Sequence, residues 1–177
     1  MRDITVSSSM TRETLPADAA KQRTLTAPDG TTQEHALQLD RRLAHGILRL
    51  ALGVSMLMHG VVRVPNLAGF ADGIVTSFAE TPLPALSVRL FALSLPFVEA
   101  GIGFLLVLGL FTRWALVAGG LVMTALVFGT ALRSDWATVS IQMIYAAIYY
   151  LLLAGKIYNY FSLDTVRAKW PVRSERF

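Results

Sequence analysis

Polar side chains dominate the start of the chain, and a long apolar region follows them. Residues 1–42 carry Ser, Thr, Gln and charged residues around Pro16 and Pro28, with no sustained apolar period. We therefore expect residues 1–42 to form a disordered, cytoplasmic N-terminal tail. The run Gln33–Arg42 is a candidate surface helix leading into the apolar region.

Four apolar segments make up the middle of the chain. They cover about residues 43–64, 87–111, 114–132 and 137–161. Each is close to the ~20 residues that an α-helix needs to cross ~30 Å of hydrocarbon. A helix satisfies its own backbone hydrogen bonds in lipid, so these segments should be helices rather than strands. The pattern predicts an all-α, polytopic membrane protein, with a four-transmembrane-helix bundle at 43–161 and a basic cytoplasmic tail at 162–177.

Basic residues near the ends of the spans predict the orientation, because positively charged loops tend to stay in the cytoplasm. Seven fall at one end, namely Arg41, Arg42, Arg113, Lys156, Arg167, Lys169 and Arg173, and three at the other, namely Arg63, Arg89 and Arg133. Both termini should therefore be cytoplasmic. The connection Pro65–Leu86 is then the one sizeable outward loop, and its apolar residues predict a short amphipathic segment on the membrane surface.

Composition agrees with a membrane location and excludes several kinds of function. Hydrophobic residues make up 54% of the chain and charged residues 16%, with a mean hydropathy of +0.51. The absence of cysteine excludes disulfides, zinc–thiolate sites and iron–sulfur clusters held by this chain. The net charge is +4, but the basic residues form no long run interleaved with exposed aromatics, so no nucleic-acid binding is expected.

Ionisable side chains within the spans are candidate functional residues, because each costs at least ~2.5–3.5 kcal/mol at the centre of a membrane helix. The first span carries Arg49, His59 and Arg63, and the second carries Glu99. Helical periodicity places Arg49 and Arg63 on one face, with His59 at its edge. We expect Arg49 to be the counter-ion of Glu99, since it lies about one turn nearer to the cytoplasm and has a long side chain.

The fourth span adds polar and aromatic residues that share one helix face. The candidate interior site therefore comprises Arg49, His59, Arg63, Glu99, Gln142, Tyr145 and Tyr149, in a polar pocket that opens under the Pro65–Leu86 connection. Two interpretations stay open for Arg49 and Glu99: an ion pair that fixes helix register, or a functional pair. His59 either relays protons or binds a quinone carbonyl, or it pairs with Glu99 or a backbone carbonyl.

The spans contain too few histidines to indicate a haem or metal site. His45 and His59 lie on one face of the first span, but no other span contains a histidine. Bis-histidine haem within this chain is therefore excluded. His59 and Glu99 alone are too few ligands for a metal ion. There is also no Gly-rich phosphate loop and no Ser/His/Asp nucleophile signature.

The run Arg49-Leu-Ala-Leu-Gly53, leading to His59-Gly60, resembles the first helix of the DoxX/DoxD-like family of integral membrane proteins. Residues 96–120, PFVEAGIGFLLVLGLFTRWALVAGG, are similar to its second helix and turn, and residues 149–164 to its ending in Ser-Leu-Asp. The matching positions are Arg49, Gly53, Gly60, Glu99, Gly103, Arg113, Ser162, Leu163 and Asp164.

This resemblance implies a multi-pass protein of the bacterial inner membrane, related to the DoxD-type subunit of thiosulfate:quinone oxidoreduction. It implies a membrane subunit of a redox system, with quinone as its candidate ligand and a link to thiosulfate or thiol oxidation. Its partners would be other membrane or soluble redox subunits, or further copies of the chain. No soluble redox domain is attached, which leaves open whether the protein is an enzyme. A non-catalytic scaffold and a small-molecule or proton transporter are the alternatives.

Overall fold

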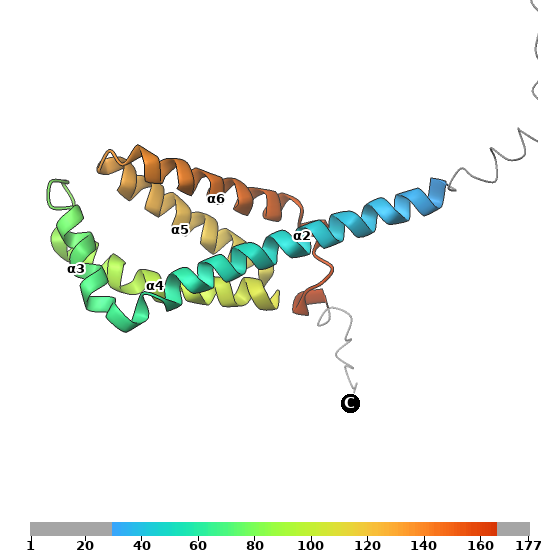
Figure 1. Ribbon diagram of the computed structural model, residues 1–177, viewed down its shortest axis with the longest axis horizontal. Coiled ribbons are helices and arrows are strands. Elements are labelled where there is room, and N and C mark those ends of the chain that lie inside the picture. The colour runs from blue at the N-terminus through green and yellow to red at the C-terminus, as the bar shows by residue number, and fades with distance from the viewer. Residues whose placement is uncertain (1–29, 166–177) are drawn as a thin grey trace, which may run out of the picture. The chain divides into compact units, whose positions relative to one another are not determined.

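The computed structural model describes residues 30–165, and every regular element among them is a helix (Figure 1). In chain order these elements are α2 (Gly30–Val61), the 3-10 helix η1 (Val64–Asn66), α3 (Leu67–Ser77), α4 (Ala85–Leu108), α5 (Thr112–Leu132), α6 (Trp136–Ala154) and the 3-10 helix η2 (Lys156–Tyr158). Four segments are long and apolar enough to cross a membrane, namely Thr31–Ser77, Ala85–Leu108, Thr112–Leu132 and Trp136–Ala154. The predicted all-α membrane fold with four spanning helices is confirmed.

Helix α2 begins well before the predicted start of the first span at residue 43. Residues 30–42 are helical, which agrees with the candidate helix at Gln33–Arg42 and shows that this part of the expected tail is ordered. The reason is that residues 33–42 consist mostly of good helix formers and contain neither Gly nor Pro, so the helix of the apolar segment extends through them. Residues 1–29 lie outside the described range. The chain divides into two units after Leu37, and the candidate site lies within the unit from Gln38 onward.

Helix α6 ends earlier than the predicted span 137–161. The helix stops at Ala154, where the Gly155 N–H bonds to the carbonyl of Leu151, and the chain then turns through η2. The apolar residues after Gly155 made the sequence segment look longer, but they do not continue the helix. Residues 162–165, predicted as the start of a basic tail, fold against the end of α4, and residues 166–177 lie outside the described range.

The connection between α2 and α4 contains the predicted short helix, α3. The Asn66 side chain accepts a hydrogen bond from the Gly69 N–H at 3.3 Å and so caps its first turn. The three basic residues predicted to share one end of the spans all contact α3 or the residue that caps it: Arg63 over Phe70, Arg89 with Asp72 and Arg133 over Phe78. Their location at one end of the bundle is confirmed. The location of α3 on a membrane surface stays a prediction.

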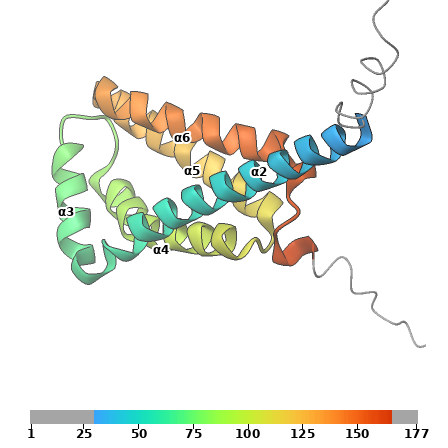
Figure 2. The same ribbon diagram turned by 45° about the vertical axis from the view of Figure 1, so that its right-hand side comes forward.

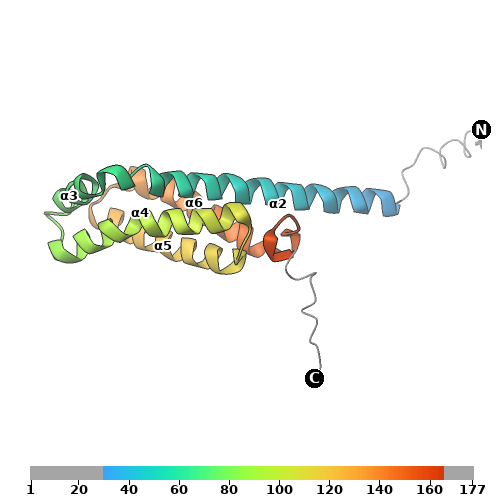
Figure 3. The same ribbon diagram turned by 90° about the horizontal axis from the view of Figure 1, so that it is seen from below.

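Helices α2 and α4 run side by side with their backbones in contact (Figures 2 and 3). A Cβ added at Gly60 would lie 2.6 Å from the Ala100 nitrogen, and one added at Gly53 would lie 2.9 Å from the Val107 nitrogen. A Cβ at Gly103 would overlap the backbone of α2 in the same way. Small residues at these positions allow membrane helices to approach closely. These contacts fix the antiparallel register of α2 against α4.

The packed core lies between the helices, and many large apolar side chains remain on the outside. The core cluster consists of Leu52, Met56, Ile102, Leu106, Ala115, Leu116, Met123, Tyr149 and Leu152. Leu90, Leu121 and Ile144 are among the exposed apolar residues. Exposing apolar side chains to water is unfavourable in free energy, so this exterior suits a lipid bilayer.

Candidate functional site

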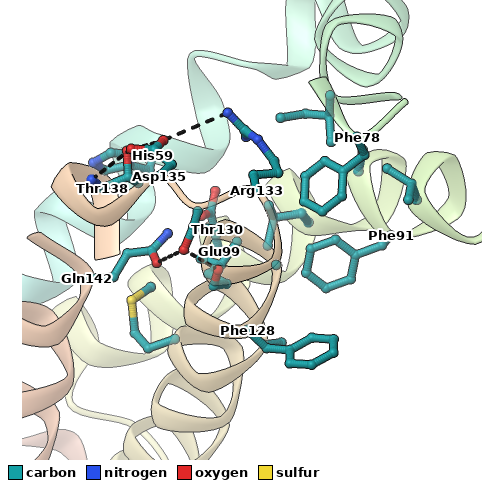
Figure 4. Close-up of a pocket in the computed structure, with 18 of the residues that line it drawn as sticks. His59, Phe78, Phe91, Glu99, Phe128, Thr130, Arg133, Asp135, Thr138 and Gln142 are labelled. Carbon is teal, nitrogen blue, oxygen red and sulfur yellow. Dashed lines mark hydrogen bonds and ion pairs between the residues drawn. The ribbon is translucent and has the colours of Figure 1, made fainter. Parts of the chain in front are cut away.

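A cavity of about 530 Å³ lies between the helices at the end of the bundle where α3 packs (Figure 4). Its apolar lining includes Met56, Phe70, Phe78, Phe91, Met123 and Phe128, and its polar lining includes His59, Arg63, Glu99, Thr130, Gln142 and Tyr145. Five of the seven predicted site residues therefore meet at this cavity. Arg49 and Tyr149 do not line it.

Glu99 pairs with Arg63, not with Arg49. The Nη1 atom of Arg63 donates to Oε2 of Glu99, whose side chain is 4% exposed against 28% for Arg63. The predicted Arg49–Glu99 pair is wrong because of the helix register. Gly60 of α2 packs against Ala100, which brings Arg63 beside Glu99 and leaves Arg49 at the opposite end of α4.

His59 is held by the same arginine. The Nη2 atom of Arg63 lies 3.4 Å from Nδ1 of His59, and because a guanidinium has no acceptor, Nδ1 must be the unprotonated nitrogen in this contact. The proton of the neutral imidazole is then on Nε2, which is left as a donor. Arg63 also stacks over Phe70 of α3, with its Cζ atom 4.9 Å from the ring centroid. One arginine thus joins α2, α3 and α4 at the cavity wall.

Helices α5 and α6 supply the facing polar groups. The Tyr145 ring packs edge-on against His59, with centroids 6.4 Å apart, and its hydroxyl lies 3.0 Å from Ser55 Oγ. One turn earlier on α6, Oε1 of Gln142 accepts a hydrogen bond of 2.7 Å from the Thr130 hydroxyl. Figure 4 shows Gln142 and Thr130 meeting across the cavity from Phe91 and Phe128. The cavity therefore has an aromatic side and a side that carries hydrogen-bonding groups.

The mouth of the cavity includes residues that sequence reasoning missed. Asp135 caps α6: its carboxylate accepts bonds from the Thr138 hydroxyl at 2.7 Å and from the Thr138 N–H at 3.2 Å. These bonds, with a smaller contribution from Arg133, hold the pKa of Asp135 below its usual value. The Asp-x-x-Thr spacing before an apolar run was the available signal. Phe91 and Phe128 could not be predicted as cavity residues from the sequence, because aromatic residues in a span suit contact with lipid equally well.

Arg49 belongs to a separate structural contact at the other end of the unit. Its Nη2 atom donates to the Phe161 carbonyl at 2.6 Å, and its Nη1 atom donates to Oδ1 of Asn159 at 3.1 Å. Gly109, which ends α4 with φ 67°, leaves the space that Arg49 fills, because a Cβ there would lie 2.9 Å from the Arg49 Cζ. Arg49 therefore fastens the segment after α6 to the end of α4.

Asp164 of the Ser162–Asp164 motif completes this contact. Its two carboxylate oxygens accept the N–H groups of Phe111 and Thr112, each at 2.8 Å, at the start of α5. Burial raises the pKa of Asp164, but the hydrogen bonds from Thr112 and Phe111 and the charge of Arg49 outweigh it and leave that pKa below its usual value. This carboxylate is thus an N-terminal cap supplied from far along the chain.

The remaining predicted residues have structural environments. Tyr149 is buried beside Gly119, and its hydroxyl has no hydrogen-bond partner among residues 30–165. Ser162 lies beside the Thr165 hydroxyl, 2.9 Å away, Leu163 is exposed next to it, and Arg113 is exposed in the first turn of α5. In the part of the chain that the structure describes, no three His, Asp or Glu side chains gather as metal ligands would.

Comparison with known proteins gives the family. The model of the DoxX family matches residues 44–134. No curated protein and no solved structure matches the chain. The matched segment runs from α2 through α5, which includes the Arg63–Glu99 pair and most of the cavity wall. It covers more than half of the chain, and this protein is therefore a multi-pass membrane protein that belongs to the DoxX family.

Proposed function

We propose that this protein is a quinone-interacting membrane subunit of a redox system, and that the cavity beside α3 holds the quinone ring. The observation that carries the proposal is a mostly apolar, aromatic cavity with a histidine donor fixed in its wall. Ligand sites commonly have this form, with apolar walls, a few placed polar groups and volumes of about 300–1,000 Å³. The volume of about 530 Å³ suits a ring of one or two fused six-membered cycles.

The charges around the cavity favour a neutral ligand. Arg63 is paired with Glu99, and Arg133 lies 3.8 Å from Asp135. Arg89, nearby on α4, pairs with Asp72 at 2.9 Å. Because each arginine has an acidic partner, a dianion such as thiosulfate would have to displace a carboxylate to bind here. We therefore assign oxidation of thiosulfate or a thiol to a partner subunit, and quinone binding to this chain.

The outer wall supports entry of the ligand from the bilayer. Phe91 on α4 is 41% exposed and Phe128 on α5 is 60% exposed, although both line the cavity. A quinone dissolved in the membrane would meet these rings first, and its isoprenoid tail could remain outside among the lipid chains. Aromatic side chains at this position stack on a flat ring without needing a fixed hydrogen-bond pattern.

The polar wall would orient the ring. A bound quinone supplies a two-electron acceptor, and the chain's own residues determine how it lies. His59 would donate from Nε2, because the Arg63 contact at Nδ1 favours that tautomer. Glu99 pairs with Arg63, so the two side chains together place no net charge beside the apolar cavity. The expected result is one preferred ring orientation with a carbonyl oxygen at His59.

A binding titration with matched histidine variants tests the proposal. Purified protein in lipid nanodiscs should bind 2,3-dimethyl-1,4-naphthoquinone. Binding is measured by the quenching of the protein's tryptophan fluorescence. His59→Leu should weaken binding about tenfold, the cost of a buried hydrogen bond left unmade. His35→Leu, on the exposed first part of α2, should leave it unchanged. Absence of binding by the wild-type protein, or equal effects of the two variants, would contradict the proposal.

The cellular setting is part of the proposal. The distribution of basic residues favours both termini in the cytoplasm, and the family resemblance favours the bacterial inner membrane. Electrons would reach the quinone from another membrane or soluble redox subunit bound to this chain, or from a subunit bound to an oligomer of it. A C-terminal affinity tag and gentle detergent extraction should recover that partner with the protein.

A further inference from the structure

We infer that Gln142 is a second ligand-anchoring residue of this cavity, and that the cavity selects rings with two opposed carbonyl oxygens. The inference rests on the proposed function and names the class of quinone that the site takes: a 1,4-dione. It follows from the direction of one hydrogen bond and from the place of Gln142 one turn before Tyr145, whose ring packs against His59.

The hydrogen bond from Thr130 fixes the Gln142 amide. The Thr130 hydroxyl lies 2.7 Å from Oε1 of Gln142, closer than it lies to the carbonyls of Leu126 at 2.9 Å and Val127 at 3.2 Å. A hydroxyl has one proton, and we assign it to the shortest of these three contacts, the one to Gln142. Since Oε1 is occupied, the group that Gln142 leaves for a ligand is its NH₂. Among residues 30–165, no partner fills this NH₂ group.

Tyr145 lies next to Gln142 on α6 and also packs against His59. Gln142 precedes Tyr145 by three residues, which puts the two side chains next to each other on one face of α6. On the other side, Tyr145 packs edge-on against His59 with a centroid distance of 6.4 Å. Gln142 and His59 are therefore both neighbours of Tyr145, and all three residues line the cavity. We infer that a ligand ring against Tyr145 turns one edge toward each donor.

The two donors differ in strength, which makes the inference testable. His59 is polarised by the guanidinium of Arg63, whereas Gln142 donates from a neutral amide oriented by a neutral hydroxyl. Hydrogen bonds in a chain polarise and strengthen one another, so His59 should be the stronger donor. A ligand with a single carbonyl oxygen should therefore bind at His59 and leave Gln142 unused. Only a ligand with two opposed carbonyl oxygens gains from both.

The test compares two ligands across three variants in nanodiscs. The ligands are 2,3-dimethyl-1,4-naphthoquinone and 1-tetralone, a fused-ring ketone that lacks the second carbonyl. Gln142→Leu should weaken naphthoquinone binding about 2- to 13-fold, the range of a neutral hydrogen bond, and leave 1-tetralone binding unchanged. Thr130→Val, which keeps the amide but frees its orientation, should show a smaller effect in the same direction. Ser140→Ala, on an exposed part of α6 away from the cavity, should change neither.

The outcomes separate this inference from the proposed function. Equal weakening of both ligands by Gln142→Leu would mean that the residue only supports the cavity wall, and would overturn the inference. Unchanged naphthoquinone binding in Gln142→Leu would overturn it as well, while His59→Leu still tests the proposed function. If the wild-type protein binds neither ligand, the proposed function fails and this inference fails with it.

Discussion

Arg49 on helix α2 and Arg63, which follows that helix, are stabilised inside the bundle in different ways. Arg63 meets the carboxylate of Glu99 at the cavity, whereas Arg49 donates to the neutral oxygens of Asn159 and Phe161. Neither pairing could be predicted from the sequence, because both depend on the register between α2 and α4. That register is set by backbone contact at Gly60 and its neighbours, and such contact leaves no charge pattern in the sequence.

Breaking the cavity ion pair should have unequal effects on its two members. Arg63→Gln should destabilise the protein by about 3 kcal/mol, because it leaves a carboxylate with 4% exposure unpaired. Glu99→Gln should cost less, since Arg63 is 28% exposed and can turn toward the surface. The double variant should recover part of the loss. Thermal unfolding in detergent measures all three, and equal losses with no recovery would show that the pair is not coupled.

Asp164 should make stability depend on pH in the acid range. Its pKa is lowered in the folded protein, so its contribution is complete above the ordinary aspartate pKa of ~3.9 and is lost as the pH falls through the lower, folded value. Asp164→Ala should cost about 1 kcal/mol at pH 7, the usual value of a helix cap. Melting curves should converge below about pH 3 as the wild type loses this contribution. A constant difference from pH 7 to pH 3 would argue against a charged cap, and Asp40→Ala, exposed on α2, serves as control.

At the scale of helices, apolar segments predicted the number and type of elements but not their ends. Helix α6 stops at Ala154 because Gly155 closes it, although apolar residues continue to Phe161. Helix α2 starts at Gly30 because polar residues with good helix propensity extend it. Hydrophobicity records which residues suit lipid, and helix ends depend on local capping as well. The cavity was predicted through its polar residues alone, because its aromatic wall looks like a lipid-facing surface in the sequence.

The contact between α2 and α4 offers a matched pair of glycines on one helix. A Cβ at Gly103 would lie 2.7 Å from both the Gly53 carbonyl oxygen and the Leu57 Cα, whereas nothing lies within 4 Å of a Cβ at Gly101. Gly103→Ala should therefore force the helices apart and lower stability by about 1–3 kcal/mol. Gly101→Ala should be neutral or slightly stabilising, since alanine favours a helix. Equal melting temperatures of the two variants would contradict direct backbone contact at Gly103.

At the scale of the whole molecule, four spanning helices predict that the two chain ends lie on the same side of the membrane. The excess of basic residues near those ends favours the cytoplasm as that side. A green fluorescent protein fused after Phe177 should fluoresce, and alkaline phosphatase fused there should be inactive. Truncation after Glu80, within the connection to α4, should reverse both results. An active phosphatase after Phe177 would overturn the orientation and place α3 on the cytoplasmic side.

The cavity beside α3 is proposed to hold a quinone, and the most direct test is to identify the quinone that co-purifies with the protein. Protein extracted gently from its native membrane should release quinone, measured by mass spectrometry, at close to one molecule per chain. Ala125 lines the cavity, so Ala125→Trp should occupy the space of the quinone and lose it while the protein remains folded. Ala147 is exposed on α6 away from the cavity, and Ala147→Trp should retain the quinone. Equal quinone in both variants, or none in the wild type, would contradict the claim.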